Sequence, residues 1–225
     1  MVSEILHKEF VVRVVVIGSE NDESFVEAYN SKRMEAVKDV RLVFFERVKN
    51  DDKVLMEADL IIVLPCSTYS YNVMRSMNNE VLYKTLAIYD EDYYHRAGVS
   101  YMYKNKIICP RGKAILAAQG IIDVMYKTNV IGLDMGDLLM ICDSCILKCD
   151  YFVGDKESII AKIKAVDKNK GFHQKRLSSI IGDIPVNDMF EILEMLNGSD
   201  FRLFGIGLDD SKEIRAFVMW ENNND

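Results

Sequence analysis

A run of β-branched residues near the N-terminus limits the fold of this chain more than any other feature. Residues Val11–Gly18 read VVRVVVIG, so apolar side chains occupy both faces of a strand at this position. Such a strand is stable where helices cover both faces of a sheet, as they do in parallel sheets. The sequence therefore predicts an α/β protein whose first core strand is Val11–Gly18.

The segments after this strand continue the α/β pattern. They predict, in order, a helix at Asn21–Asp39, strands at Val40–Val48 and Asp59–Pro65, a helix at Asn72–Tyr83 and a strand at Leu86–Tyr89. The stretch Glu91–Lys106 is polar and aromatic, and we expect a loop there. These elements indicate a Rossmann-like N-terminal domain with a parallel sheet.

A long central helix follows at Gly112–Lys127, which reads GKAILAAQGIIDVMYK. Ile115, Ala118, Ile122 and Met125 recur at helical spacing, and the alanines permit close packing on both sides. We expect this helix to lie between two sheets. The predicted domains are therefore 1–110, a central helix at 111–128, and 129–225.

The last hundred residues form a second α/β pattern. They predict helices at Met135–Cys142, Lys156–Val166 and Val186–Leu196, and strands at Cys145–Val153, Ser178–Gly182, Phe201–Leu208 and Glu213–Trp220. The last two strands are separated only by Asp209–Lys212, a spacing that is compatible with a β-hairpin.

Composition excludes several classes of protein. The 225 residues are 49% apolar, enough for real cores, and 28 basic against 35 acidic residues leave a net charge of −7. Because no cluster of lysine and arginine could neutralise phosphates, we expect no nucleic-acid partner. Charges interrupt Met1–Phe10, and no apolar stretch reaches the length of a membrane span, so we predict a cytoplasmic protein without direct membrane contact.

The five cysteines are expected to be reduced, because their number is odd and the chain reads as intracellular. Cys142, Cys145 and Cys149 form C-x2-C-x3-C, which resembles part of a metal site. A structural zinc needs four ligands, and this run straddles a helix and an apolar strand. We interpret the three as core thiols and expect no metal.

Three patches of the second half resemble the bacterial and archaeal tubulin homologue FtsZ. The segment AAQGIIDVMYKTNVIGLDMGDLLMI, from Ala117 to Ile141, resembles the FtsZ pattern A-V-Q-G-I-x-D-L-I followed by L-I-N-V-D-F-A-D-V. The residues in register are Gln119, Gly120, Asp123, Asp134 and Asp137, whereas Gly132 replaces the family's asparagine. DIPVNDMFEILEML, from Asp183, and FGIGLDDSKEIRAFVM, from Phe204, look like the family's last helix and closing hairpin.

The resemblance covers about Ile107 to Trp220 well and the first hundred residues in outline. It implies a tubulin/FtsZ-like fold: a Rossmann-like N-terminal sheet, a central helix, and a C-terminal α/β activation-type domain. It also implies head-to-tail stacking, in which an acidic loop positions water on the GTP of the next subunit. Asp134 and Asp137 match that loop and are the candidate catalytic residues, acting in trans on a partner's GTP.

A structural role explains the same two acids. Asp134 suits an N-cap and Asp137 suits the third position of the helix that follows, where both would satisfy free backbone N–H groups. The spacing alone does not distinguish capping from catalysis.

The nucleotide-binding loops depart from the family pattern. The first loop should read like V-I-G-x-G-G-x-G-x-N, but here it is VIGSENDES, with Glu20, Asp22 and Glu23 where glycines belong. Carboxylates there lack the backbone freedom of glycine and repel phosphate. The second loop, normally G-G-G-T-G-T-G, is PCSTYSYN from Pro65 to Asn72. We expect Tyr69 and Tyr71 to project into the space that the phosphates need.

A third change lies at the start of the central helix, where the family carries an Ala-Asp pair near the guanine. Pro110, Arg111 and Gly112 stand there instead. With three such losses we expect no bound GTP and no other cofactor.

Three hypotheses of function follow. The first is a non-catalytic FtsZ-like cytoskeletal or cell-division protein that acts by protein–protein contacts with an FtsZ-type filament subunit or itself, capping or modulating filaments. No GTPase activity is expected from this chain in isolation. The second is a divergent polymerising GTPase that does bind GTP. The third is a Rossmann-like enzyme or small-ligand binder that uses Cys66, which ends a strand and precedes Ser67 and Thr68.

Overall fold

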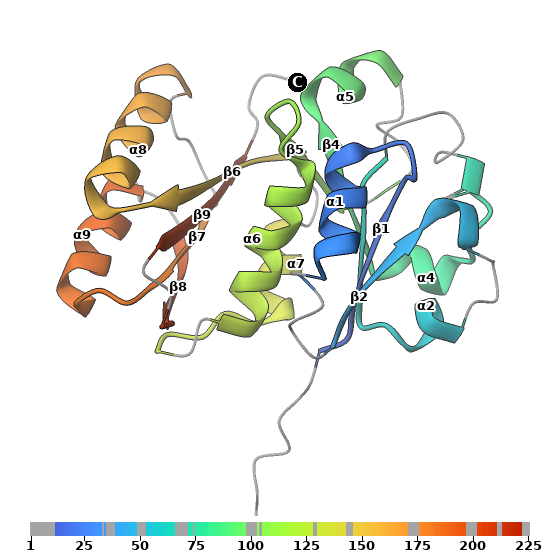
Figure 1. The fold of residues 1–225 in the computed structure, drawn as a ribbon, viewed down its shortest axis with the longest axis horizontal. Helices are drawn as coiled ribbons and strands as arrows, with labels where there is room; N and C mark the ends of the chain where they lie inside the picture. The colour runs from blue at the N-terminus through green and yellow to red at the C-terminus, as the bar shows by residue number, and fades with distance from the viewer. Residues whose placement is uncertain are drawn as a thin grey trace, which may run out of the picture.

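One continuous sheet runs through the molecule (Figure 1). The computed structural model describes residues 12–32, 34, 39–48, 53–65, 72–73, 75–97, 103, 105–127, 130–142, 146–170, 176–196, 202–210 and 213–221. Within them the strands are β1 Val14–Gly18, β2 Val40–Phe44, β3 Leu60–Val63, β4 Thr85–Asp90, β5 Asn105–Cys109, β6 Ile146–Gly154, β7 Arg176–Gly182, β8 Arg202–Leu208 and β9 Ile214–Glu221. Their order is β2-β1-β3-β4-β5-β6-β9-β7-β8, and only β9 runs antiparallel to its neighbours.

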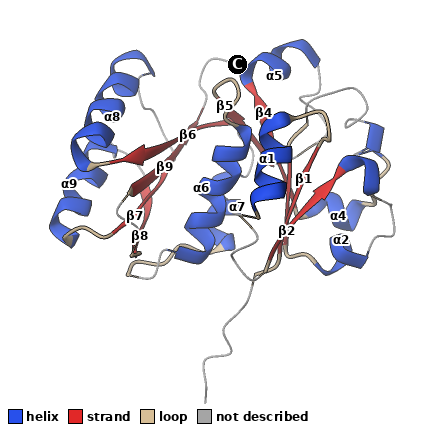
Figure 2. Cartoon of the chain, in the orientation of Figure 1, coloured by secondary structure: helices blue, strands red, loops and turns tan. Residues whose placement is uncertain are grey.

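Helices cover both faces of this sheet (Figure 2). They are α1 Glu23–Ser31, α2 Lys53–Glu57, α4 Asn79–Tyr83, α5 Glu91–Ala97, α6 Ala114–Lys127, α7 Met135–Cys142, α8 Lys156–Lys170 and α9 Val186–Leu196, with a 3-10 turn at Phe45–Arg47. The core under α1, α6 and α7 extends across both halves of the sheet. The opposite face carries two separate cores, one under α2, α4 and α5 and one under α8 and α9.

The first strand is buried on both faces, as its β-branched run predicts. Val14 and Val16 belong to the core under α1 and α6, whereas Val15 and Ile17 belong to the core under α2 and α4. Burial of each such side chain stabilises the fold by about 1.5–3 kcal/mol. The α/β class and the parallel N-terminal sheet are therefore confirmed.

The central helix α6 does not separate two sheets, contrary to our expectation. Strands β5 and β6 pair in parallel, with Lys106 opposite Ile146 and Ile107 opposite Leu147. This pairing joins the strands of both halves into one sheet, and α6 packs on β4 as well as on β6 and β9.

The predicted C-terminal hairpin is also wrong. Strand β9 lies between β6 and β7, whereas β8 pairs in parallel with β7 at the edge of the sheet. Burial explains the choice, because Ala216–Trp220 are all buried, as a central strand requires. The short connection through Asp209 and Asp210 therefore crosses over β7.

The predicted loop Glu91–Lys106 contains helix α5 and the first two residues of β5 instead. Helix α5 starts directly after β4, where the Asp90 carboxylate accepts a hydrogen bond from the Asp92 N–H at 3.0 Å. Tyr93 and Tyr94 pack on the buried Tyr89 ring, with ring centroids 6.4 and 5.7 Å away. Aromatic packing thus holds a segment that has no helical periodicity of its own.

Other boundaries differ in detail. Helix α1 ends at Ser31 because Lys32 adopts a left-handed conformation, with φ 52°. The predicted helix at 72–83 is interrupted by Asn78, whose side chain caps the short α4. The bounds of α7 and α9 agree with the prediction.

No helix in the described part of the chain is long and apolar enough to cross a membrane.

Candidate functional site

The carboxyl ends of the first strands form a cleft of about 370 Å³, which we call the carboxyl-edge cleft. Strand β1 pairs with β2 on one side and with β3 on the other, so the order of the strands reverses at β1. Ligands of open α/β sheets bind beside the carboxyl ends of the strands at such a reversal. The cleft is lined by Asp22, Ser24, Leu64, Pro65, Asp90, Asp92, Tyr93, Arg111, Gly112 and Ala114. Three aspartates therefore line this cleft.

Asp22 caps helix α1, whose N-terminus opens into this cleft. Its Oδ1 accepts hydrogen bonds from the N–H groups of Ser24 and Phe25, at 3.0 and 3.2 Å, and from the Ser24 hydroxyl at 2.6 Å. Phosphate binding at a helix N-terminus uses these same N–H groups and the positive end of the helix dipole. Here the Asp22 carboxylate already accepts from two of these N–H groups and lies at the positive end of the dipole.

The turn between β1 and α1 is tightly packed. Gly18 ends β1, and a Cβ added to it would lie 2.3 Å from the Phe25 ring. Phe25 is fully buried and packs edge-on against Phe44, with centroids 5.5 Å apart. Gly18 therefore serves the packing of α1 on the sheet, a structural reason for the glycine that both this chain and the family pattern share.

Glu46 brings another carboxylate to the same turn from the end of β2. It accepts hydrogen bonds from the Ser19 hydroxyl at 3.3 Å and from the Glu20 N–H at 3.4 Å. Glu20 in turn lies 3.4 Å from Arg47. The Ser19 hydroxyl and the Glu20 N–H thus donate to an acidic side chain of the protein itself, while the N–H groups of Asn21 and Asp22 donate to Ser19.

Asp90 and Asp92 close the other side of the cleft. The Asp90 carboxylate accepts hydrogen bonds from the N–H groups of Asp92, at 3.0 Å, and Gly112, at 2.5 Å. Arg111 lies 3.3 Å from Asp92, so its guanidinium is partly neutralised. The segment Pro110–Gly112, which replaces the family's Ala-Asp pair, is in this way tied to the start of α5.

Glu46 and Asp90 are site residues that the sequence patterns do not indicate. The predicted strand Val40–Val48 includes Glu46, but the strand ends at Phe44 and a 3-10 turn follows. Asp90 comes directly after an apolar strand, and that position is the signal that could have identified it, because strand carboxyl ends line such clefts. The residues Cys66–Tyr71, which include Ser67, Thr68, Tyr69 and the Cys66 of the third hypothesis, lie outside the described residues.

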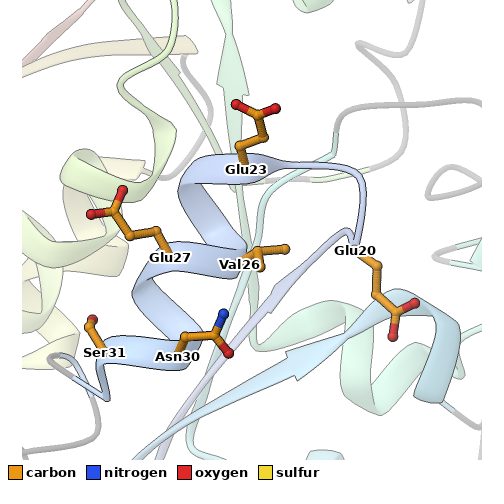
Figure 3. Close-up of a pocket in the computed structure, with 6 residues that line it drawn as sticks. All are labelled: Glu20, Glu23, Val26, Glu27, Asn30 and Ser31. Atoms are coloured by element: carbon orange, nitrogen blue, oxygen red, sulfur yellow. The ribbon is translucent and has the colours of Figure 1, made fainter.

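A second, shallower depression of about 630 Å³ lies on the outer side of α1. It is lined by Glu20, Glu23, Val26, Glu27, Asn30 and Ser31, and Figure 3 shows that the three glutamate side chains point in different directions. Diverging carboxylates cannot share a cation. We interpret this depression as the solvated surface of α1.

Asp134 and Asp137 form a reciprocal capping pair at the start of α7. The Asp137 N–H donates to Asp134 Oδ1 at 2.9 Å, and the Asp134 N–H donates to Asp137 Oδ2 at 3.0 Å. The structural role that the spacing allows is therefore present. Helix α6 begins at the cleft and its 14 residues span about 20 Å, so these acids lie far from their own chain's cleft.

The cysteine motif does not form a metal site among the residues that the structure describes. Cys142 and Cys149 are buried in the core under α6, and Cys145 lies outside the described residues. Cys109 is also buried, and burial with the nearby Asp90 raises the pKa of its thiol to about 12. These cysteines pack as apolar side chains.

Asp123, which matches the FtsZ pattern, lies at the centre of a buried polar network under α6. It accepts hydrogen bonds from Gln119 at 3.0 Å and from the Tyr151 hydroxyl at 2.7 Å, and Arg215 lies 3.6 Å away. Burial, followed by the Asp123 charge, raises the pKa of Tyr151. Burial opposes the charge of Arg215, but Asp123 and Asp209 outweigh this effect and raise its pKa.

Comparisons with known proteins bear on the fold. No protein-family model and no curated protein matches the sequence. The structure is similar to CetZ from Methanosaeta thermophila, with 11% identity over 94% of this chain and 87% of that chain and a TM-score of 0.61. It is also similar to CetZ2 from Haloferax volcanii in a GTPγS-bound protofilament, with 13% identity over 93% and 92% of the two chains and a TM-score of 0.55.

TubZ from Bacillus thuringiensis serovar israelensis, in GDP-form protofilaments, gives 9% identity over 93% and 84% of the two chains and a TM-score of 0.56. CetZ and TubZ are proteins of the FtsZ/tubulin superfamily. At such low identity the likeness concerns the fold alone, and this fold agrees with the one that the sequence predicts. The chain therefore has the tubulin/FtsZ fold.

Proposed function

We propose that this chain is a cytoskeletal protein that acts through protein–protein contacts and does not bind guanine nucleotide in its carboxyl-edge cleft. The similar CetZ2 and TubZ structures are protofilaments, which supports a place among filament proteins. The observation that carries the proposal is the Asp22 carboxylate on the N-terminal N–H groups of α1.

The electrostatics of the cleft favour this view. A bound phosphate would have to displace Asp22 and then lie beside a carboxylate that has lost its hydrogen bonds. Two like unit charges 4 Å apart repel by about 4 kcal/mol at an effective dielectric constant of about 20. Asp90 and Asp92 add negative charge on the opposite wall, and Arg111 is already engaged with Asp92.

The first test is calorimetric titration of the purified protein with GTP, GDP and GTPγS in the presence of magnesium. We expect no heat of binding. A dissociation constant at or below about 1 μM, which is about 8 kcal/mol of binding free energy, would contradict the proposal and favour the divergent GTPase.

The matched variant is Asp22→Ser, since serine keeps an N-cap acceptor but carries no charge. If this variant gains nucleotide binding, the Asp22 charge is the main barrier. If the variant still binds no nucleotide, the remaining acids and the packing at Gly18 are sufficient to prevent binding.

The finer form of the proposal concerns the partner. Head-to-tail contacts join two unlike surfaces, so a filament extends only while both surfaces are functional. This chain keeps the acidic loop at Asp134 and Asp137 but has an obstructed cleft. It would therefore dock its acidic loop on the nucleotide of an FtsZ-type subunit and end the filament there, with the free carboxylate oxygens directed at that subunit's GTP.

Substitution of Asp134 or Asp137 by alanine tests this contact. Each should cost about 1 kcal/mol of stability, because one capping hydrogen bond is lost. When added in substoichiometric amount to polymerising FtsZ from the same organism, the wild type should shorten filaments and both variants should not. Filament length by electron microscopy and GTP turnover are the measurements.

The matched control is Asp155→Ala, which removes an exposed cap from α8, where Asp155 Oδ1 accepts from the Ser158 N–H at 2.7 Å. It should cost about as much stability yet leave filament shortening intact. Filaments unchanged by wild-type protein would end the capping hypothesis. Equal shortening by all variants would leave Asp134 and Asp137 with their helix-capping role only.

A further inference from the structure

Strand β6 extends beyond its neighbour β5 and leaves a gap in the sheet. It pairs with β9 from Leu147 to Gly154, but with β5 only as far as Lys148. Residues 150–153 of β6 therefore have no neighbouring strand on the β5 side within the described part of the chain. Figure 1 shows β6 running from β5 past the first turn of α6 toward α8.

A proline ends the pairing of β5 with β6. Strand β5 stops at Cys109, and the next residue is Pro110, which has no N–H to donate to another strand. The chain then turns at Gly112, whose backbone is left-handed with φ 66°, and α6 begins at Ala114. The sequence thus directs the chain out of the sheet at the point where β6 continues.

The edge of β6 presents backbone groups to this gap. The Lys162 ammonium donates to the Val153 carbonyl at 2.8 Å, so the backbone groups of Val153 point away from β9. Because the direction of these groups alternates along a strand, the N–H and C=O of Tyr151 point to the same side. Neither the Tyr151 N–H nor the Val153 N–H donates across this edge to another described residue. Strand edges of this kind pair with another extended chain.

A cavity of about 490 Å³ lies along this edge, and we call it the β6 notch. One wall is the start of α6, with Leu116 and Ala117, and the other is α8, with Lys162 and Ala165. Residues 150–153 of β6 form its floor and span about 13 Å, so an added strand of about four residues fits. The mostly apolar walls suit apolar side chains that alternate between the two sides of such a strand.

The closed end of the notch favours a negative charge. Lys113 and Lys162 line the notch, and the only carboxylate among its lining residues is that of Asp150. Both lysines are exposed, and neither forms an ion pair with a described residue. The Lys113 N–H donates to the Pro110 carbonyl at 3.0 Å, which places Lys113 where β5 ends. The N-terminus of α6 lies at this same end and adds partial positive charge.

This geometry favours the end of a polypeptide over an internal segment. Because β5 occupies the same line of the sheet up to Cys109, an added strand cannot continue past that residue. A chain terminus can stop there. A C-terminal carboxylate is complementary to Lys113, whereas an N-terminal ammonium is not. With its C-terminus at the closed end, the added strand runs antiparallel to β6.

We propose that the β6 notch binds the C-terminal end of a partner polypeptide as an added antiparallel strand. The last residues of the partner hydrogen-bond to the backbone of Tyr151 and Val153, and the terminal carboxylate binds Lys113. This site does not depend on the proposed function, because none of its residues lines the carboxyl-edge cleft or belongs to the acidic loop at Asp134 and Asp137.

The test uses three fluorescent octapeptides. The first has glycine and serine in its first half, valine and isoleucine in its second half, and a free C-terminal carboxylate. The second is the same peptide with a C-terminal amide, and the third has the two halves exchanged. Fluorescence anisotropy measures binding to the full chain. The first peptide should bind with a Kd below about 1 mM, and the other two at least tenfold more weakly. Rising salt should weaken binding of the first peptide.

Two variants locate the contact. Lys113→Gln changes an exposed side chain and should weaken binding of the first peptide at least tenfold, while binding of the amide stays the same. Val153→Pro removes an N–H that faces the notch and not β9, so it should weaken binding of both peptides. The control Lys164→Gln changes an exposed lysine of α8 that does not line the notch, and it should leave binding unchanged.

Amide hydrogen exchange of the wild type, followed by NMR, provides a readout that needs no variant. When the first peptide binds, the N–H groups of Tyr151 and Val153 should exchange at least tenfold more slowly. The N–H of Phe152, which faces β9, should exchange at its former rate. No binding of any peptide, equal binding of the acid and the amide, undiminished binding by Lys113→Gln, or unchanged exchange at Tyr151 and Val153 would each overturn the proposal.

Discussion

Replacement of Asp123 by leucine is expected to lower the free energy of unfolding by about 3–5 kcal/mol, as is usual when one partner of a buried ion pair is removed. Asp123 is 1% exposed and accepts hydrogen bonds from Gln119 and Tyr151. Without it, the Arg215 guanidinium keeps Asp209 at 2.5 Å but loses its buried counter-charge, and the Tyr151 hydroxyl loses its acceptor. Urea unfolding followed by circular dichroism measures the change.

Two variants show where this energy arises. Asp123→Asn keeps an acceptor for Tyr151 but removes the charge, so its cost should lie between that of leucine and zero. Glu57→Gln breaks the exposed pairs of Glu57 with Lys53, 3.4 Å away, and with Arg13, 3.8 Å away, and should change stability by less than about 1 kcal/mol. If Asp123→Leu lowers the free energy of unfolding no more than Glu57→Gln does, the buried network around Asp123 does not hold α6 to the strands β6 and β9.

Replacement of Gly207 by valine is expected to cost about 3 kcal/mol or more, at the upper end of what overpacking a core usually costs. A Cβ at this position would lie 1.8 Å from the Lys127 carbonyl oxygen and 3.1 Å from Ile181 Cγ1. The first neighbour is backbone at the end of α6, so it cannot rotate away as a side chain would. Thermal and urea unfolding measure the loss.

The control for this substitution is Gly182→Ala. Its added Cβ would lie 3.3 Å from the nearest atom, Ile214 Cα, a contact that small shifts relieve, so we expect a cost below about 1 kcal/mol. Equal stability of Gly207→Val and wild type would mean that α6 and β8 separate easily. In that case the segment from Val130, which bonds to Ile206, would not be held in its position by the sheet.

Local patterns in the sequence were sufficient to predict the elements whose residues repeat regularly. The β-branched run at Val14–Ile17 predicts a strand buried on both faces because every second side chain meets the same core. The bounds of α7 and α9 were predictable because their apolar faces have the helical period. The acids at Asp134 and Asp137 suggested a capping pair, and the structure contains its hydrogen bonds.

Only the tertiary structure decided the strand order and the content of the cleft. The continuous apolar run Ala216–Trp220 is typical of a strand buried on both faces, but it does not say which strands lie beside it. The position of β9 between β6 and β7 depends on packing against α6, α8 and α9. Likewise, Glu46 reaches Ser19 and Asp90 reaches Gly112 across 27 and 22 residues of chain. Periodicity is a property of neighbours along the chain, whereas these contacts arise only when distant segments meet at one edge of the sheet.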